Sequence, residues 1–102
     1  MTVVTQEDLI PYDRTLLSKA LPAIDARKKP LRSADFLESA DIDYKLSSKV
    51  ANINSLAKII TLSTGATLKY DKLCVATGSS VRKPEMPGSD LKGVYCLRTS
   101  AD

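Results

Sequence analysis

A nearly unbroken apolar run at Lys72–Ala76 is the feature that most constrains the fold of this 102-residue chain. Strands with one wet face alternate apolar and polar residues, whereas a continuous apolar strand is typical of a parallel sheet covered on both faces. The turn Thr77–Ser80 follows directly, and ligands of open α/β sheets bind beyond the strand ends. The sequence therefore predicts an α/β fold with a central strand here and a ligand site after it.

A second strand of the same sheet is predicted at the β-branched run Val3–Thr5. We expect it to lie parallel to Lys72–Ala76, as its neighbour or near neighbour. Leucines at near-helical spacing predict a short helix at 15–20, which Pro22 ends.

A second short helix is predicted after Ser33, whose side-chain oxygen can accept a hydrogen bond at the helix N-terminus. Its apolar residues Phe36 and Leu37 are expected to face inward. Asp41–Leu46 alternates polar and apolar residues and predicts a half-buried strand.

The middle of the chain predicts a small antiparallel meander that is inserted between the parallel strands. Its strand-like runs are Lys49–Ile53, Lys58–Leu62 and Thr67–Tyr70, and Gly65 supplies a turn. Beyond the proline-rich loop, Gly93–Leu97 predicts a last short strand, and 98–102 resembles a helix start.

Composition excludes several classes of function. The chain has no histidine, and its two cysteines do not form a CxxC pair, so a metal site is not expected. The missing histidines also favour chemistry carried by an organic cofactor. A net charge of +3 and a basic cluster at 27–29 without interleaved aromatic residues argue against nucleic-acid binding. No apolar run is long enough to span a bilayer and no signal peptide is evident, so we expect an intracellular protein.

Two motifs are specific enough to indicate a family. The first is YDRxxLSK at Tyr12–Lys19, and the second is YDKLxxATGSS at Tyr70–Ser80. With the helix start at Leu31–Phe36 and the LRT string at 97–99, they resemble the FAD-dependent pyridine nucleotide-disulphide oxidoreductases. The resemblance covers essentially the whole chain and is strongest to the apoptosis-inducing-factor-like and ferredoxin-reductase-like branch.

This resemblance implies a fold and an activity. The expected fold is a partial FAD/NAD(P)-binding Rossmann-like domain with the small meander as an insertion, so that 1–102 form one internal fragment of an FAD-binding domain. The implied function is transfer of electrons from NAD(P)H through FAD to an acceptor, such as an iron-sulphur protein, in the cytoplasm or in mitochondria. The fragment alone is expected to be inactive.

Three charged residues are the first candidates for the cofactor site. Glu7 follows the first strand, where an acidic residue of a dinucleotide-binding fold accepts hydrogen bonds from ribose hydroxyls. The guanidinium of Arg14 can clamp pyrophosphate oxygens, and the ammonium of Lys19 can lie near the flavin and tune it. The alternatives are an exposed loop carboxylate for Glu7 and a solvated helix residue for Lys19.

Further candidates come from the matched strings. The turn Ala76, Thr77 and Gly78 is implied to lie against the dinucleotide, and glycine lets backbone approach a cofactor closely. The resemblance places the backbone of Val50 against the adenine and Arg98 near the flavin. A core valine and a surface arginine are the competing interpretations.

The chain also departs from the family pattern. It contains no GxGxxG fingerprint, which holds the pyrophosphate at a helix N-terminus, and we expect the NAD(P)H-binding and C-terminal domains to lie outside it. Cys74 stands where relatives more often carry an aliphatic residue, and we interpret it as an inert, buried small hydrophobe. A truncated, non-enzymatic interaction or structural module that has lost the cofactor remains an alternative function.

Overall fold

The computed structural model describes residues 1–19, 25 and 28–102. The expected end of the first helix at Ala20 and Pro22, and Arg27 of the basic cluster, lie outside these residues. The chain divides into two compact units. Unit 1 consists of Met1–Pro11 and Leu31–Val75, and unit 2 consists of Tyr12–Pro30 and Ala76–Asp102.

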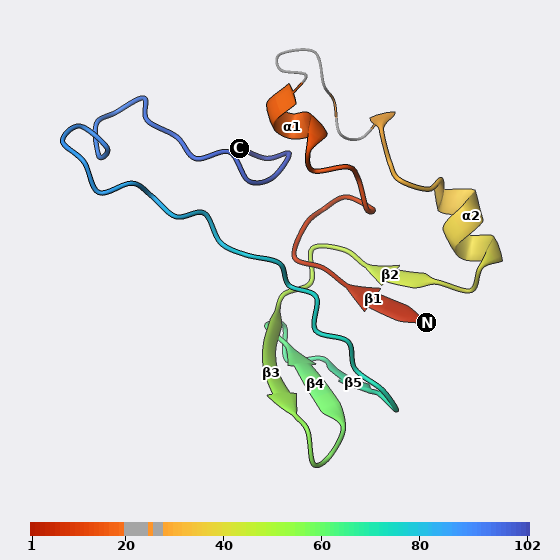
Figure 1. The fold of residues 1–102 in the computed structure, drawn as a ribbon. Helices are drawn as coiled ribbons and strands as arrows, with labels where there is room; N and C mark the ends of the chain where they lie inside the picture. Colours follow the sequence, from red (N-terminus) through yellow and green to blue (C-terminus); the bar gives the residue numbers. More distant parts are fainter. Residues whose placement is uncertain (20–24, 26–27) are drawn as a thin grey trace. The chain divides into compact units, whose positions relative to one another are not determined.

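Unit 1 contains a pair of parallel strands with a helix between them in sequence. Strand β1 (Thr2–Val4) pairs with β2 (Asp43–Lys45), with Val3 opposite Tyr44 (Figure 1). Helix α2 (Ala34–Ser39) precedes β2. A strand that returns parallel to an earlier one needs such a crossover connection, so the first predicted strand and the α/β character of the chain are confirmed.

The start of α2 follows from its N-cap residue. Ser33 has an extended backbone, and its Oγ accepts a hydrogen bond from the Phe36 N–H at 3.2 Å. Leu37 is buried, as predicted. The prediction that Phe36 faces inward is wrong, because this residue is 48 % exposed. The guanidinium carbon of Arg32 lies 5.5 Å from the centroid of the Phe36 ring.

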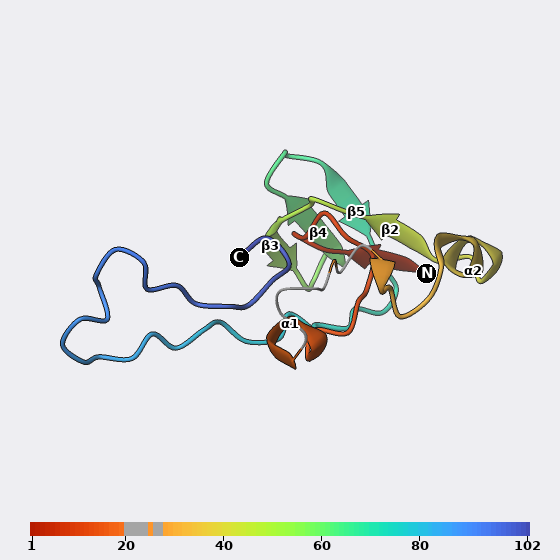
Figure 2. The same ribbon diagram turned by 90° about the horizontal axis from the view of Figure 1, so that it is seen from above.

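The rest of unit 1 is the predicted meander. Strands β3 (Val50–Asn54), β4 (Ile59–Leu62) and β5 (Thr67–Lys69) form one antiparallel sheet in that order (Figure 2). Gly65 makes the β4–β5 turn with a φ of +88°, a conformation that glycine adopts without steric cost. The alternating residues Ile60 and Leu62 of β4 are buried.

The predicted central strand at Lys72–Ala76 is not formed among the described residues. This segment is exposed along its length, Val75 at 65 %, and the partner of β1 is β2. The prediction that Val3–Thr5 lies beside Lys72–Ala76 is therefore wrong for this chain. Burial on both faces needs neighbouring strands and covering layers. Cys74, expected to be buried, is exposed.

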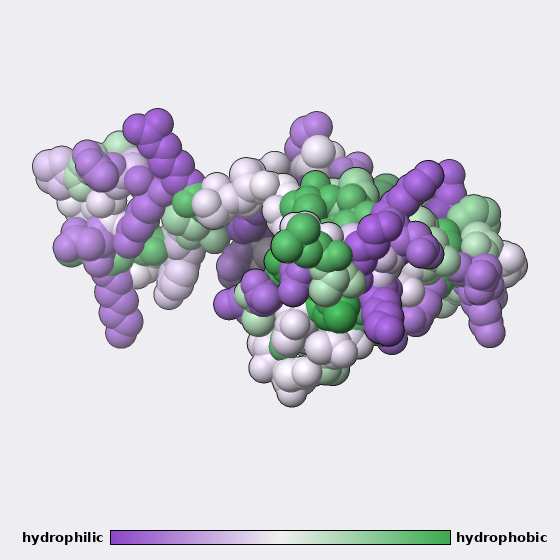
Figure 3. Space-filling model, turned by 90° about the horizontal axis from the view of Figure 1, so that it is seen from below, coloured by the Kyte–Doolittle hydropathy of each residue, from purple (hydrophilic) through white to green (hydrophobic). Residues whose placement is uncertain are grey.

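Unit 2 has little regular structure. Helix α1 (Leu16–Lys19) lies within the predicted range and buries Leu17. Gly93 lies in a turn and 94–97 form no strand, so the strand predicted at Gly93–Leu97 is wrong. A turn at 99–101 stands where a helix start was expected. Many large apolar side chains are exposed, among them Leu91, Val94 and Tyr95. On the face drawn in Figure 3, apolar side chains lie open between hydrophilic ones.

Candidate functional site

Arg14 is held by the residues around it in unit 2. Its Nη1 donates to the Arg98 carbonyl oxygen at 2.7 Å and to the Tyr12 hydroxyl at 3.3 Å. Its guanidinium carbon lies 5.3 Å from the centroid of the Tyr12 ring, within the range of a cation–π contact. These contacts join two parts of the sequence 84 residues apart.

Asp13 lies three residues before α1 and fixes the backbone after Arg14 through Thr15. Its Oδ1 accepts from the Thr15 N–H at 2.9 Å and from the Thr15 hydroxyl at 2.7 Å. The hydroxyl of Thr15, then its N–H, and to a lesser extent the charge of Lys19, lower the pKa of Asp13. The aspartate of the YDR string therefore closes a local turn with Thr15 directly before the helix Leu16–Lys19.

A second carboxylate closes the turn at 98–102. Oδ2 of Asp102 accepts from the backbone N–H groups of Thr99 and Arg98, the latter at 2.7 Å. These two bonds, Thr99 first, lower the pKa of Asp102. The Ser100 N–H donates to the Tyr12 hydroxyl at 3.1 Å, so this turn is fastened both by its own carboxylate and by Tyr12.

A pH dependence follows from these two carboxylates. A carboxyl group whose pKa is lowered on folding stabilises the folded state above its unfolded pKa of about 4 and loses that stabilisation as the pH falls through the lowered value. We expect the melting temperature of the protein to fall between about pH 5 and pH 2, and to fall less in Asp102→Asn. The matched control is the exposed Asp90 of the same unit: an Asp90→Asn variant with the same blunted response would contradict the assignment.

Gly78 provides a close approach between backbone and side chain. Its φ is +71°, and a Cβ built on it would lie 2.7 Å from Nη2 of Arg98. A side chain at position 78 would therefore displace the guanidinium. Ala76 and Thr77 precede it in the same unit and are exposed. The structure thus brings Gly78, Arg14 and Arg98 together, as members of the predicted site.

Two arginines help to line a small depression in unit 2. It has a volume of about 100 Å³, and its lining residues are Arg14, Leu17, Ser18, Leu97 and Arg98. Lys19 is exposed at the end of α1 and does not line this depression. Sequence reasoning named both arginines but not their contact, because residues 84 apart carry no signal of proximity in their spacing.

Glu7 and Val50 belong to unit 1. Glu7 is half-buried after β1, where its N–H donates to Thr5 Oγ1 at 3.2 Å and its carbonyl accepts from the Ser47 N–H at 2.9 Å. Val50 is the first residue of β3, is 37 % exposed and precedes a register irregularity. The backbone at both positions is thus held by neighbouring segments of unit 1.

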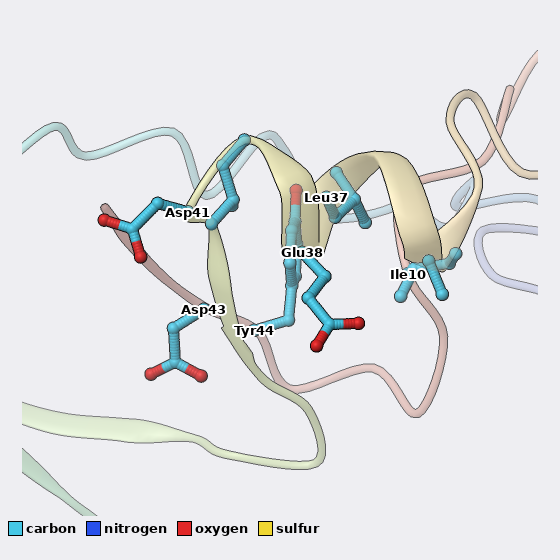
Figure 4. Close-up of a pocket in the computed structure, with 8 residues that line it drawn as sticks. Ile10, Leu37, Glu38, Asp41, Asp43 and Tyr44 are labelled. Atoms are coloured by element: carbon cyan, nitrogen blue, oxygen red, sulfur yellow. The ribbon is translucent and has the colours of Figure 1, made fainter.

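One pocket of unit 1 is lined by none of the predicted cofactor-site residues. It holds about 350 Å³ beside α2 and β2. Figure 4 shows its apolar side, with Ile10 and Leu37, and the carboxylates of Asp41 and Asp43, which point away from these two residues. No group of residues that could hold a metal ion occurs in the part of the chain that the structure describes.

Comparison with known proteins gives consistent results. The family model described as pyridine nucleotide-disulphide oxidoreductase matches residues 1–102. A benzene 1,2-dioxygenase system ferredoxin–NAD(+) reductase subunit from Pseudomonas putida is 37 % identical over 103 residues, which cover 100 % of this chain and 25 % of that protein. A rubredoxin–NAD(+) reductase from the same organism is 31 % identical, over 98 % of this chain and 26 % of its own length.

The solved structures agree with the sequence relatives. The crystal structure of a ferredoxin reductase from Rhodopseudomonas palustris superposes with a TM-score of 0.86 at 27 % identity, over 99 % of this chain and 25 % of that one. The chain thus spans about a quarter of the length of the relatives that it matches.

Within the described residues, no helix is both long and apolar enough to cross a membrane.

Proposed function

The chain belongs to the pyridine nucleotide-disulphide oxidoreductase family, and from this we propose that residues 1–102 form part of the FAD-binding domain of an NAD(P)H-dependent reductase. Because the chain spans only a quarter of its relatives, the activity is proposed for a longer protein. Its proposed acceptor is a small iron-sulphur or related electron-transfer protein, since the relatives are named as reductases of ferredoxin and of rubredoxin. The comparisons do not support the mitochondrial alternative.

The observation that carries this proposal is the pairing of two arginines beside Gly78. Guanidiniums bind phosphate oxygens through planar, charge-assisted hydrogen bonds. Arg14 and Arg98 line one depression, and the absence of a Cβ at Gly78 makes room for Arg98. This donor set fits the pyrophosphate of a dinucleotide, whereas it offers nothing to a metal ion.

We assign the remaining predicted residues by the same chemistry. Arg14 and Arg98 would bind the anionic part of FAD, and Ala76, Thr77 and Gly78 would offer backbone to it at close range. In unit 1, the half-buried Glu7 would accept hydrogen bonds from the ribose hydroxyls and Val50 would present its backbone to the adenine. Bound FAD would supply the electron transfer, and Lys19 would tune it as a nearby positive charge.

The test is the cofactor content of the full-length protein that contains this chain. We expect it to purify with about one FAD per chain and the absorption spectrum of a flavoprotein, and NAD(P)H is expected to bleach that spectrum under anaerobic conditions. The alternative, a structural module without a cofactor, predicts a colourless protein that binds no added FAD. A colourless protein would therefore refute the proposed function.

A further inference from the structure

We propose that Tyr12 is the positioning residue of this site: its hydroxyl sets the orientation of Arg14 and fastens the turn that carries Arg98. The inference rests on the proposed function, because the consequence of the orientation is measured as affinity for FAD. It assigns a role to a residue that does not itself line the depression between the two arginines.

The hydroxyl oxygen of Tyr12 is shared between two distant segments. It accepts from Nη1 of Arg14 at 3.3 Å and from the N–H of Ser100 at 3.1 Å. The same Nη1 donates to the Arg98 carbonyl at 2.7 Å. One oxygen thus connects the segment after Pro11 with the turn at 98–102, and removing it releases both connections together.

The hydroxyl adds a directional constraint that the ring cannot provide. A cation over an aromatic face is attracted by the whole ring and can slide across it, whereas a hydrogen bond weakens steeply as its angle departs from linearity. The ring of Tyr12, 5.3 Å from the Arg14 guanidinium, therefore sets the distance of the cation, and the hydroxyl sets the direction of its Nη1 edge. Binding of phosphate through the planar guanidinium depends on that direction.

The turn at 98–102 is closed by its own hydrogen bonds, and the Tyr12 hydroxyl attaches it to the segment of Arg14. Asp102 already binds the N–H groups of Arg98 and Thr99. The bond from Ser100 to Tyr12 attaches this closed turn to the segment that carries Arg14. Tyr12 thus contacts the guanidinium of Arg14 directly, and it holds the turn that carries Arg98 through the backbone of Ser100.

The decisive variant is Tyr12→Phe, made in the full-length protein and studied as apoprotein titrated with FAD. It removes the hydroxyl and keeps the ring under Arg14. We expect the dissociation constant for FAD to rise about tenfold, the size typical of a lost hydrogen bond to a charged group. The matched control is Tyr95→Phe, which removes a hydroxyl from the same unit at a side chain that is 83 % exposed, and we expect it to change the constant by less than about twofold.

A double-mutant cycle with Arg14→Lys separates positioning from general destabilisation. Arg14→Lys keeps the charge and removes the planar fork. If Tyr12 acts through Arg14, Tyr12→Phe has little further effect on FAD affinity in the Arg14→Lys background, whereas independent effects add. Full additivity would overturn the inference, as would an unchanged affinity in Tyr12→Phe.

A third variant covers the case in which Tyr12→Phe fails to fold. Ser100→Pro keeps Tyr12 and removes the backbone N–H that its hydroxyl accepts. We expect it to weaken FAD binding several-fold. No loss of affinity in this variant would contradict the fastening of the turn. A wild-type protein that binds no FAD refutes the proposed function itself, whereas a wild type that binds FAD as tightly as Tyr12→Phe refutes only the role of Tyr12.

Discussion

Residues 1–102 expressed alone are expected to form no stoichiometric complex with FAD, with a dissociation constant weaker than about 10 μM, whereas the full-length protein is expected to retain FAD through purification. The arginines of unit 2 supply charge, but the chain contains no GxGxxG turn to offer backbone N–H groups at a helix N-terminus. Its described helices, Leu16–Lys19 and Ala34–Ser39, are too short to provide that site. Losing such a cradle removes several charge-assisted hydrogen bonds at once.

Exposed apolar surface is a second reason for weak binding. Val75 is 65 % exposed just before the turn at Ala76, Thr77 and Gly78, so little packing holds this backbone in the position that a cofactor would need. Ordering it on binding would cost conformational entropy, which lowers affinity. Quenching of flavin fluorescence by the isolated chain measures the constant, with the full-length protein as the control. A yellow complex of micromolar or higher affinity in the isolated chain would contradict the prediction.

The elements that the sequence predicted correctly are those that depend on neighbouring residues. The side chain of Ser33 caps the helix three residues away, and Gly65 makes a turn between β4 and β5. The meander follows from short alternating runs joined by short loops, so that each strand pairs with the next one in sequence. In these cases the physical cause lies within a few residues of its effect.

The elements that were predicted wrongly depend on partners elsewhere in the fold. The apolar run at Lys72–Ala76 indicates a segment suited to burial on both faces, but the pattern does not identify which strands pair with it. The orientation of Phe36 likewise depends on what lies opposite the helix, and the contact with Arg32 keeps the ring at the surface. The periodicity of apolar residues indicates which face of a segment is suited to burial, whereas its actual burial also depends on the neighbouring segments of the fold.

The site was predicted residue by residue, but its assembly was not. Spacing gave no reason to bring Arg14 to Arg98, and only the family resemblance, through the YDRxxLSK motif and the LRT string, placed both near one cofactor. The contact follows from a carbonyl, a hydroxyl and a turn that become neighbours after folding. Asp13 and Asp102 were assigned no role from the sequence, although the carboxylate of each accepts a backbone N–H at or next to one of the arginines.

Lys19→Ala in the full-length protein is expected to lower the reduction potential of the bound FAD by tens of millivolts and to slow its reduction by NAD(P)H. Reduction adds negative charge to the flavin, and a nearby ammonium stabilises that charge. A contact of this kind contributes about 1 to 3 kcal/mol, and for a two-electron couple about 1.4 kcal/mol corresponds to about 30 mV. Lys19 ends α1, and its charge acts on the Asp13 carboxylate of the same motif, so its ammonium belongs to the segment that carries Arg14.

The matched controls are Lys28→Ala and Lys29→Ala, which remove the same charge from a loop outside both motifs. Lys28 is solvated, 82 % exposed at its side chain, and its ion pair with Asp25 has a length of 3.9 Å. Exposed charges of this kind contribute about 0 to 1 kcal/mol, so we expect both controls to keep the wild-type potential within about 20 mV. FAD content, potential and the rate of anaerobic reduction are measured for all three variants. If Lys19→Ala matches the two loop variants in each measurement, its ammonium is a solvated helix charge, and the tuning of the flavin has to come from Arg14 or Arg98 instead.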